Sequence, residues 1–164
     1  KRYNNSRSWN FNVSRQGWRY HMSNIMAAIG IQQLKKFNKF ADLRKQIAIK
    51  YDQLLSSNQN IKFLNRDYKN VVPHIYVIRI KGLNDRDGLR IAMNNKGIEI
   101  GVHYTPNHFL SFFKSEQTNK LPITEKVYKE IISLPIHPDI NNGDIKNVIS
   151  TLENLLPSYT DNAK

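Results

Sequence analysis

The chain has 164 residues, of which 40% are hydrophobic, and contains no cysteine. This length suits one domain with a hydrophobic core, and no apolar run approaches the roughly 20 residues of a membrane-spanning helix, which argues against a membrane protein. The formal charge of +12 favours anionic partners such as nucleic acid or phosphorylated ligands. Since the basic residues are spread over the whole sequence, a solvated basic surface is an equal alternative. The lack of cysteine is compatible with the cytoplasm, where we expect the protein.

The N-terminal third predicts one long helix or a helix pair. Residues 1–21 show no clear hydrophobic period, and Ser23 or Asn24 can cap a helix whose apolar residues recur at helical spacing. Because the chain starts with Lys1 and this polar lead-in runs straight into a helix, we expect a piece of a larger protein. Gly30 weakens a helix interior, so we expect it to mark close packing against another backbone.

The rest of the chain alternates short strand and helix signals. Strands are predicted at 61–64, 74–80 and 98–104, helices at 84–97, 124–132 and 141–156, helical turns at 107–116, and an extended piece at 133–138. We therefore predict an α+β fold, in which the long helix precedes a small mixed sheet of three to four strands with helices packed on one face.

The residues alone do not predict a complete active site. His103 and His108 are five positions apart and can point both rings into one cleft, whereas His137, between two prolines, is interpreted as structural. Without cysteines or zinc-enzyme spacing, we expect no metal site, and no nucleophile elbow or glycine-rich phosphate loop occurs. The aromatic and basic residues of the lead-in could bind nucleic acid, but no recognition motif supports this, and we expect no nucleic-acid partner.

Three ordered motifs carry a resemblance to a known family. They are "GWRYHMSNIMAAIGIQQL" at 17–34, continued by a charged helix to Tyr51 and Asp52; "VPHIYVIRI" at 72–80 with "GIEIGVHYTPNHFLSFF" at 97–113; and "LPITEKVYKEIISLPIHPDINNGDIKNVI" at 121–149. Together they resemble the C-terminal part of the DegT/StrS-like sugar-nucleotide aminotransferases, over nearly the whole chain.

The resemblance implies a pyridoxal-phosphate enzyme of the aspartate-aminotransferase fold (fold-type I). Such enzymes move an amino group, usually from glutamate, onto a keto sugar attached to a nucleotide, in surface-polysaccharide or amino-sugar biosynthesis. Members hold the cofactor on a Schiff-base lysine beside a glycine-rich turn that is absent here, so we expect no catalytic residue in this chain. By the same resemblance, 1–21 is a lead-in from the large domain with a cross-subunit loop, 22–57 the connecting and dimerisation helix, and 58–164 the C-terminal small domain.

The resemblance also implies roles for five residues. Arg19 and His21 occupy the positions that contact the cofactor phosphate of the partner subunit in a homodimer, although relatives usually carry an asparagine at one of them. His103, Tyr104 and His108 match the small-domain loop that closes on the substrate, and for His108 loop packing is the alternative. Trp18 and Tyr20 are expected to anchor the opening loop by burial.

Two alternatives stay open, one for the whole chain and one for two of its residues. The chain can be a binding or assembly module that reuses this domain without catalysis. Arg19 and His21 can simply be solvated residues of the opening loop. The keto sugar, the nucleotide and the aminated carbon are also open.

Overall fold

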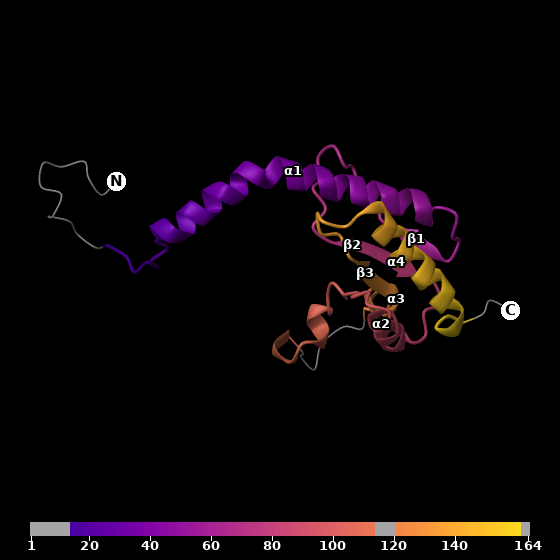
Figure 1. Ribbon diagram of the computed structural model, residues 1–164. Helices are drawn as coiled ribbons and strands as arrows, with labels where there is room; N and C mark the ends of the chain where they lie inside the picture. The colour runs from indigo at the N-terminus through magenta and orange to yellow at the C-terminus, as the bar shows by residue number, and fades with distance from the viewer. Residues whose placement is uncertain (1–13, 114–120, 162–164) are drawn as a thin grey trace, which may run out of the picture. The chain divides into compact units, whose positions relative to one another are not determined.

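The computed structural model describes residues 14–113 and 121–161 (Figure 1). The chain divides into two units between Lys36 and Phe37. Its longest element is the helix α1, Asn24–Leu55, which is one helix of 32 residues and not a pair. Ser23 caps it, because the backbone N–H of Met26 donates to the Ser23 hydroxyl at 3.3 Å.

The sheet has three strands in the order β1 (Ile61–Phe63), β2 (Tyr76–Ile80) and β3 (Ile131–Leu134). Both pairings are antiparallel, with Phe63 opposite Ile78 and Ile78 opposite Ile132. The expectation of a mixed sheet is therefore wrong, whereas the number of strands lies within the predicted range. A mixed sheet would need the segment 98–104 to lie parallel to β2 as its neighbour, but β3 lies between the two.

The segment 98–104 was predicted as a strand, and the structure corrects this. Its ladder is a single bridge, in which Gly101 N donates to Ser133 O at 3.0 Å and Ser133 N donates to Gly101 O at 2.8 Å. The strand that it meets is β3, whose residues were predicted partly as the end of the helix 124–132 and partly as the extended piece 133–138. The β-branched pair Ile131 and Ile132 continues the apolar pattern of the preceding helix, so periodicity alone does not separate the two elements.

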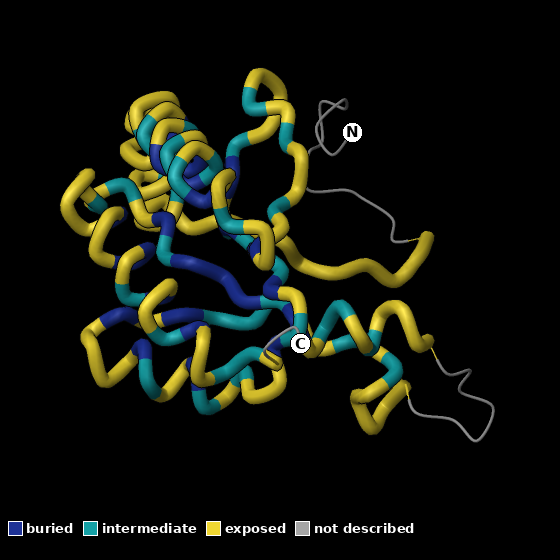
Figure 2. Tube along the Cα trace, turned by 90° about the vertical axis from the view of Figure 1, so that its right-hand side faces the viewer, coloured by how far each residue is buried: buried dark blue, intermediate teal, exposed yellow. Residues whose placement is uncertain are grey.

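One face of the sheet carries the hydrophobic core. Tyr76, Ile78 and Ile80 alternate with half-buried residues along β2, and they are fully buried. The same core cluster includes residues of α1, α2 (Arg86–Asn95) and α4 (Asn142–Leu155), so three helices cover this face, as the sequence predicts. The buried strands run through the middle of the small domain as dark segments (Figure 2), and α4 crosses in front of β2 and β3 (Figure 1).

The remaining elements are short. They are α3 (Pro122–Glu130) and three 3₁₀ turns, η1 (Asn107–Phe109), η2 (Ser111–Phe113) and η3 (Leu156–Ser158). The two turns η1 and η2 confirm the helical turns predicted for this loop. Among the helices of 14–113 and 121–161, none is long and apolar enough to cross a membrane.

Side-chain caps fix the starts of α2 and α4. Asp85 accepts a hydrogen bond from Gly88 N at 2.8 Å, and a Cβ at position 88 would collide with this carboxylate and displace the cap. Asn141 accepts from Gly143 N and Asp144 N, while the Asp144 carboxylate accepts from Asn141 N at 3.0 Å. This reciprocal capping box sets the N-terminus of α4.

Candidate functional site

The opening loop presents a pair of basic side chains. Arg19 and His21 are exposed, and the Nε–H of Arg19 donates to Nδ1 of His21 at 3.1 Å. Since Nδ1 accepts this bond, a neutral His21 carries its proton on Nε2. The terminal nitrogens of Arg19 and the Nε2–H of His21 then remain as donors, which is the donor set that a phosphate group accepts.

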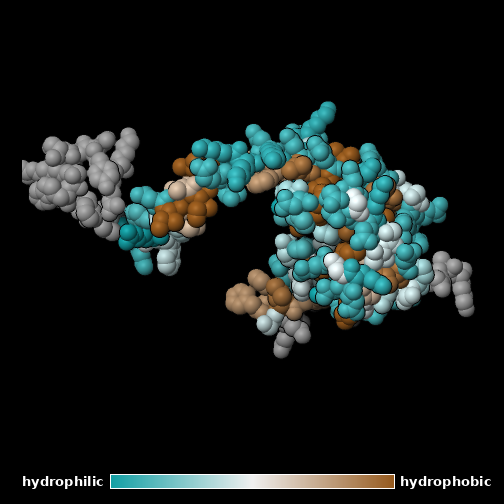
Figure 3. All heavy atoms as spheres, in the orientation of Figure 1, coloured by the Kyte–Doolittle hydropathy of each residue, from teal (hydrophilic) through white to brown (hydrophobic). Residues whose placement is uncertain are grey.

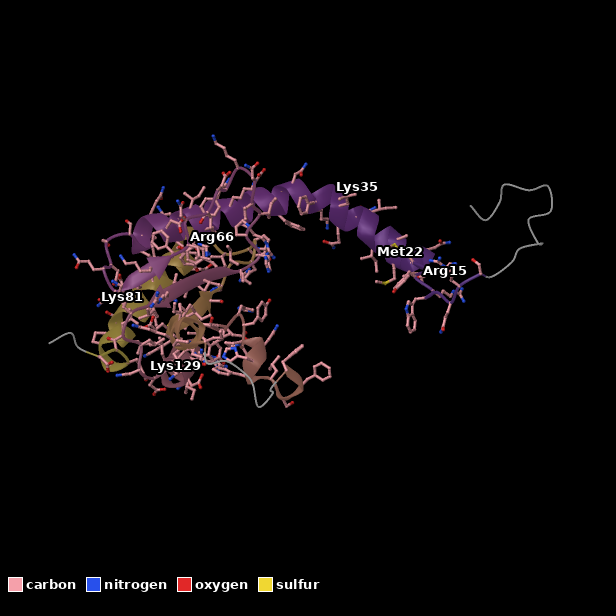
Figure 4. The ribbon with its side chains drawn as sticks, turned by 180° about the vertical axis from the view of Figure 1, so that it is seen from behind. Arg15, Met22, Lys35, Arg66, Lys81 and Lys129 are labelled. Carbon is pink, nitrogen blue, oxygen red and sulfur yellow. The ribbon has the colours of Figure 1, made fainter. Side chains whose placement is uncertain are left out.

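The neighbouring aromatic residues do not pack as expected. Trp18 is 81% exposed and Tyr20 is 87% exposed, so the prediction that burial of these rings anchors the loop is wrong for this chain. Residues 14–22 contain no buried side chain, so the described part of this loop does not cover the two rings. Met22 lies directly before α1 and is labelled with Arg15 in Figure 4.

In the small domain, His103 is held in a defined position. Its Nδ1 lies 2.8 Å from the hydroxyl oxygen of Ser133 on β3, and its ring meets that of Tyr104 edge to face at 4.7 Å. A Cβ at Gly101 would lie 2.8 Å from Cε1 of His103, so the glycine makes room for the imidazole. Ser133 was not singled out from the sequence, since its role depends on pairing across the sheet.

A cleft of about 650 Å³ lies beside His103. Polar side chains of α1, of the loop before β2, of the segment after α2, of β3 with the loop that follows it, and of α4 line it: Arg44, His74, Glu99, His103, Ser133, His137, Asp144 and Asn147. His137, interpreted as structural from the sequence, therefore borders the same cleft as His103. Within the described residues no group of three or more histidine, aspartate or glutamate side chains is arranged to hold a metal ion.

His108 faces a different part of the small domain. Its side chain is 12% exposed, and Nε2 lies 3.3 Å from a carboxylate oxygen of Glu125 on α3, outside good hydrogen-bond geometry. Its ring contacts Phe109 at 4.4 Å. The expectation that His103 and His108 share one cleft is wrong, because the turn η1 at 107–109 directs His108 toward α3.

Tyr128 of α3 fastens the same loop. Its hydroxyl lies 3.4 Å from the hydroxyl of Thr105, and the guanidinium of Arg86 stacks 4.5 Å over its ring while donating to its backbone oxygen at 2.6 Å. The hydrogen bond with Thr105 and then that with Arg86 lower the pKa of Tyr128. The loop that carries His103 and Tyr104 is thus attached to α3 at two points, Thr105 and His108.

Comparisons with known proteins agree on one family. The sequence profile of the DegT/DnrJ/EryC1/StrS aminotransferase family matches residues 2–153. Over 154 residues the chain is 31% identical to a UDP-4-amino-4,6-dideoxy-N-acetyl-beta-L-altrosamine transaminase of Campylobacter jejuni, covering 92% of this chain and 41% of the relative. The chain therefore spans about two fifths of the length of the relatives it matches.

Solved structures give the same result. The aminotransferase TlmJ of Streptoalloteichus hindustanus is 26% identical with a TM-score of 0.77, over 95% of this chain and 42% of TlmJ. Helicobacter pylori PseC, an aminotransferase involved in the biosynthesis of pseudoaminic acid, is 25% identical with a TM-score of 0.81, over 90% of this chain and 41% of PseC. These matches confirm the fold of the C-terminal small domain.

Proposed function

Because the chain belongs to the DegT/DnrJ/EryC1/StrS aminotransferase family, we propose that it is the C-terminal part of an enzyme that transfers an amino group, from glutamate, to a nucleotide-linked keto sugar. The observation that carries the proposal is the family match over 2–153, together with the small-domain fold shared with PseC. The Campylobacter jejuni relatives are named as transaminases, which supports the same reaction class.

Aminotransferases of this family depend on pyridoxal phosphate, which supplies the electron sink for the amino transfer when it is bound. In the proposal Arg19 and His21 bind the phosphate of this cofactor in the partner subunit of a homodimer. The free donors on Arg19 and His21 support this role, since a guanidinium and an imidazole N–H can each donate to a phosphate oxygen. These residues position the cofactor and neutralise its charge.

The small-domain loop contributes the substrate contacts in this proposal. His103 borders the cleft, and Tyr104 is 68% exposed, so both are available to a nucleotide-linked sugar. His108 is mostly buried beside Glu125, which favours the alternative role of holding the loop on α3. The amino donor and the nucleotide sugar are both anionic, in agreement with the net positive charge of the chain.

The test compares this chain alone with a longer polypeptide, which also contains the residues encoded upstream of residue 1. Amino transfer from glutamate to a UDP-linked keto sugar is measured for each with added pyridoxal phosphate. We expect activity only in the longer polypeptide, and we expect Arg19→Ala in it to weaken cofactor binding about tenfold or more, while the nearby exposed Arg15→Ala does not.

Two outcomes contradict the enzyme proposal. The first is a longer polypeptide that folds and binds no pyridoxal phosphate. The second is a start codon directly before residue 1 with a chain that binds a nucleotide sugar and transfers no amino group, which is the result expected of a binding module. Equal cofactor binding by the Arg19→Ala and Arg15→Ala variants would contradict only the assignment of Arg19.

A further inference from the structure

Ser133 is a buried polar residue that contacts the proposed substrate loop, and its hydroxyl group makes a single hydrogen bond among the described residues. The residue is 5% exposed and lies on β3 between Ile132 and Leu134, which face the core. Its backbone N–H and C=O are both bonded to Gly101. Among the residues that the structure describes, Nδ1 of His103 at 2.8 Å is the hydrogen-bond partner of the hydroxyl.

This contact discriminates between the two neutral forms of His103. If Nδ1 carried the proton, it would donate to the Ser133 oxygen, and the buried hydroxyl proton would have no acceptor among the described residues. A buried donor without a partner disfavours that form by about tenfold or more. If the hydroxyl donates to Nδ1, both groups are satisfied and the ring proton lies on Nε2.

The Nε2 atom is the one that a ligand can reach. It has no hydrogen-bond partner in 14–113 or 121–161, and it is not among the buried polar atoms without partners. His103 lines the 650 Å³ cleft. The ring is held on two sides, by the Ser133 hydroxyl at Nδ1 and by the Tyr104 ring, which meets it edge to face.

We propose that Ser133 is a positioning residue that fixes His103 in the Nε2–H form, so that His103 donates a hydrogen bond into the cleft and does not act there as a general base. The group it recognises is therefore an acceptor oxygen of a phosphoryl or hydroxyl group. Arg44 and His137 border the same cleft and can donate hydrogen bonds beside it, whereas Glu99 and Asp144 can accept hydrogen bonds from hydroxyl groups. Only the link to a nucleotide sugar rests on the proposed function.

The test is the ring-nitrogen NMR spectrum of the ¹⁵N-labelled full chain at about pH 8, where histidine is mostly neutral. His103→Gln identifies the signals. We expect His103 to be in the Nε2–H form to an extent clearly beyond that of the exposed His74 in the same sample, and the Ser133 hydroxyl proton to exchange slowly. A predominantly Nδ1–H ring, or a form ratio equal to that of His74, would overturn the proposal.

Two variants test the cause. Ser133→Ala removes the donor, so we expect the His103 form ratio to shift toward that of His74, and Ser133→Thr, which keeps a hydroxyl, to restore it. Gly101→Ala keeps Ser133 and displaces the ring, so it gives the same loss by another route. An unchanged ratio in a folded Ser133→Ala chain would show that Ser133 does not position the ring.

Ligand contact is measured separately with inorganic phosphate as the probe. We expect phosphate to shift the Nε2 signal of His103 in the parent chain and in Ser133→Thr, with an affinity at least about threefold weaker in Ser133→Ala. Phosphate that binds without moving the His103 signal would overturn the donor role. If His103 is fixed in the Nε2–H form but the folded longer polypeptide has no aminotransferase activity, the proposed function is contradicted and the role of Ser133 stays intact.

Discussion

Asp52 illustrates how a single carboxylate holds a loop to a helix. It lies on α1 and accepts hydrogen bonds from the hydroxyls of Tyr68 at 2.6 Å and Tyr76 at 2.7 Å. Tyr68 belongs to the loop after β1, whereas Tyr76 starts β2 and stacks on Tyr51 at 4.8 Å. Arg66, labelled in Figure 4, belongs to the same loop as Tyr68. Its guanidinium lies 4.9 Å from the centre of the Tyr76 ring. The network therefore ties the long connection between β1 and β2 to α1.

Replacing Asp52 with alanine is expected to destabilise the chain by about 2–3 kcal/mol, because two tyrosine hydroxyls lose an ionised acceptor. Urea unfolding followed by circular dichroism measures the loss. Asp42→Ala is the matched control, since Asp42 lies on the same helix and is exposed. Equal unfolding midpoints for the two variants would contradict the assigned role of the network.

The same tyrosines predict how stability depends on pH. Burial, and then the hydrogen bond to Asp52, raise the pKa of Tyr68 to about 12 from an ordinary 10.0, and the same causes raise the pKa of Tyr76. The unfolded chain loses these protons near pH 10 while the folded chain keeps them. The contribution to stability is thus complete below about pH 10 and is lost as the pH rises toward 12.

We accordingly expect the free energy of unfolding to fall between about pH 10 and 12, and to fall less steeply in Tyr68→Phe, which has no hydroxyl to ionise. Urea titrations at several pH values measure both slopes. Because lysines also titrate in this range, the difference between the two proteins is the informative quantity. Identical slopes would show that Tyr68 titrates alike in the folded and unfolded chains.

At the scale of the element, the capping box of α4 is expected to contribute to the stability of the chain. Asn141→Ala removes the acceptor for Gly143 N and Asp144 N, which should cost about 1 kcal/mol. Asn142→Ala, one residue later and also exposed, is the control and should change stability by less than about 0.5 kcal/mol. If both variants unfold at the same urea concentration, the cap contributes nothing measurable.

The elements with their own local signals were predictable from the sequence. α2 and α4 combine helical periodicity with a capping residue, and β2 is β-branched, so these three elements lie close to their predicted places. The segment 98–104 also has the apolar and β-branched pattern of a strand, yet it forms only a single bridge, between Gly101 and Ser133 of β3. Propensity describes a segment, whereas a strand requires a neighbour.

The same limit applies to the candidate site. His103 could be selected from its motif, but Ser133, Gly101 and Tyr128 act on the loop only through contacts between residues 23 or more positions apart, or through a close approach of the ring. The spacing of His103 and His108 did not show that η1 would separate their directions. The sequence thus points to candidate side chains, and tertiary pairing decides which of them face one another.

At the scale of the whole molecule, the first part of α1 is apolar and uncovered. Met22, which precedes the helix, and Ile25, Met26 and Ile29 within it are between 52% and 73% exposed, and the spacing of the last three places them on one face of α1. These hydrophobic side chains are visible at the start of the helix in Figure 3. Apart from the backbone of its own helix, none of the described residues has an atom within 4 Å of the position that a Cβ would take at Gly30. An exposed apolar stripe of this kind favours self-association.

The homodimer that we propose makes this stripe its contact, so Ile25→Glu should weaken self-association by roughly thirtyfold or more, since it places a charge in an apolar interface. Asn38→Glu adds the same charge on another side of α1 and should leave the association constant within about threefold of the parent. Sedimentation velocity over a range of concentrations measures both. A parent chain that stays monomeric at the highest concentration would contradict the dimer contact, and equal weakening by both variants would assign the association to net charge instead of to the stripe.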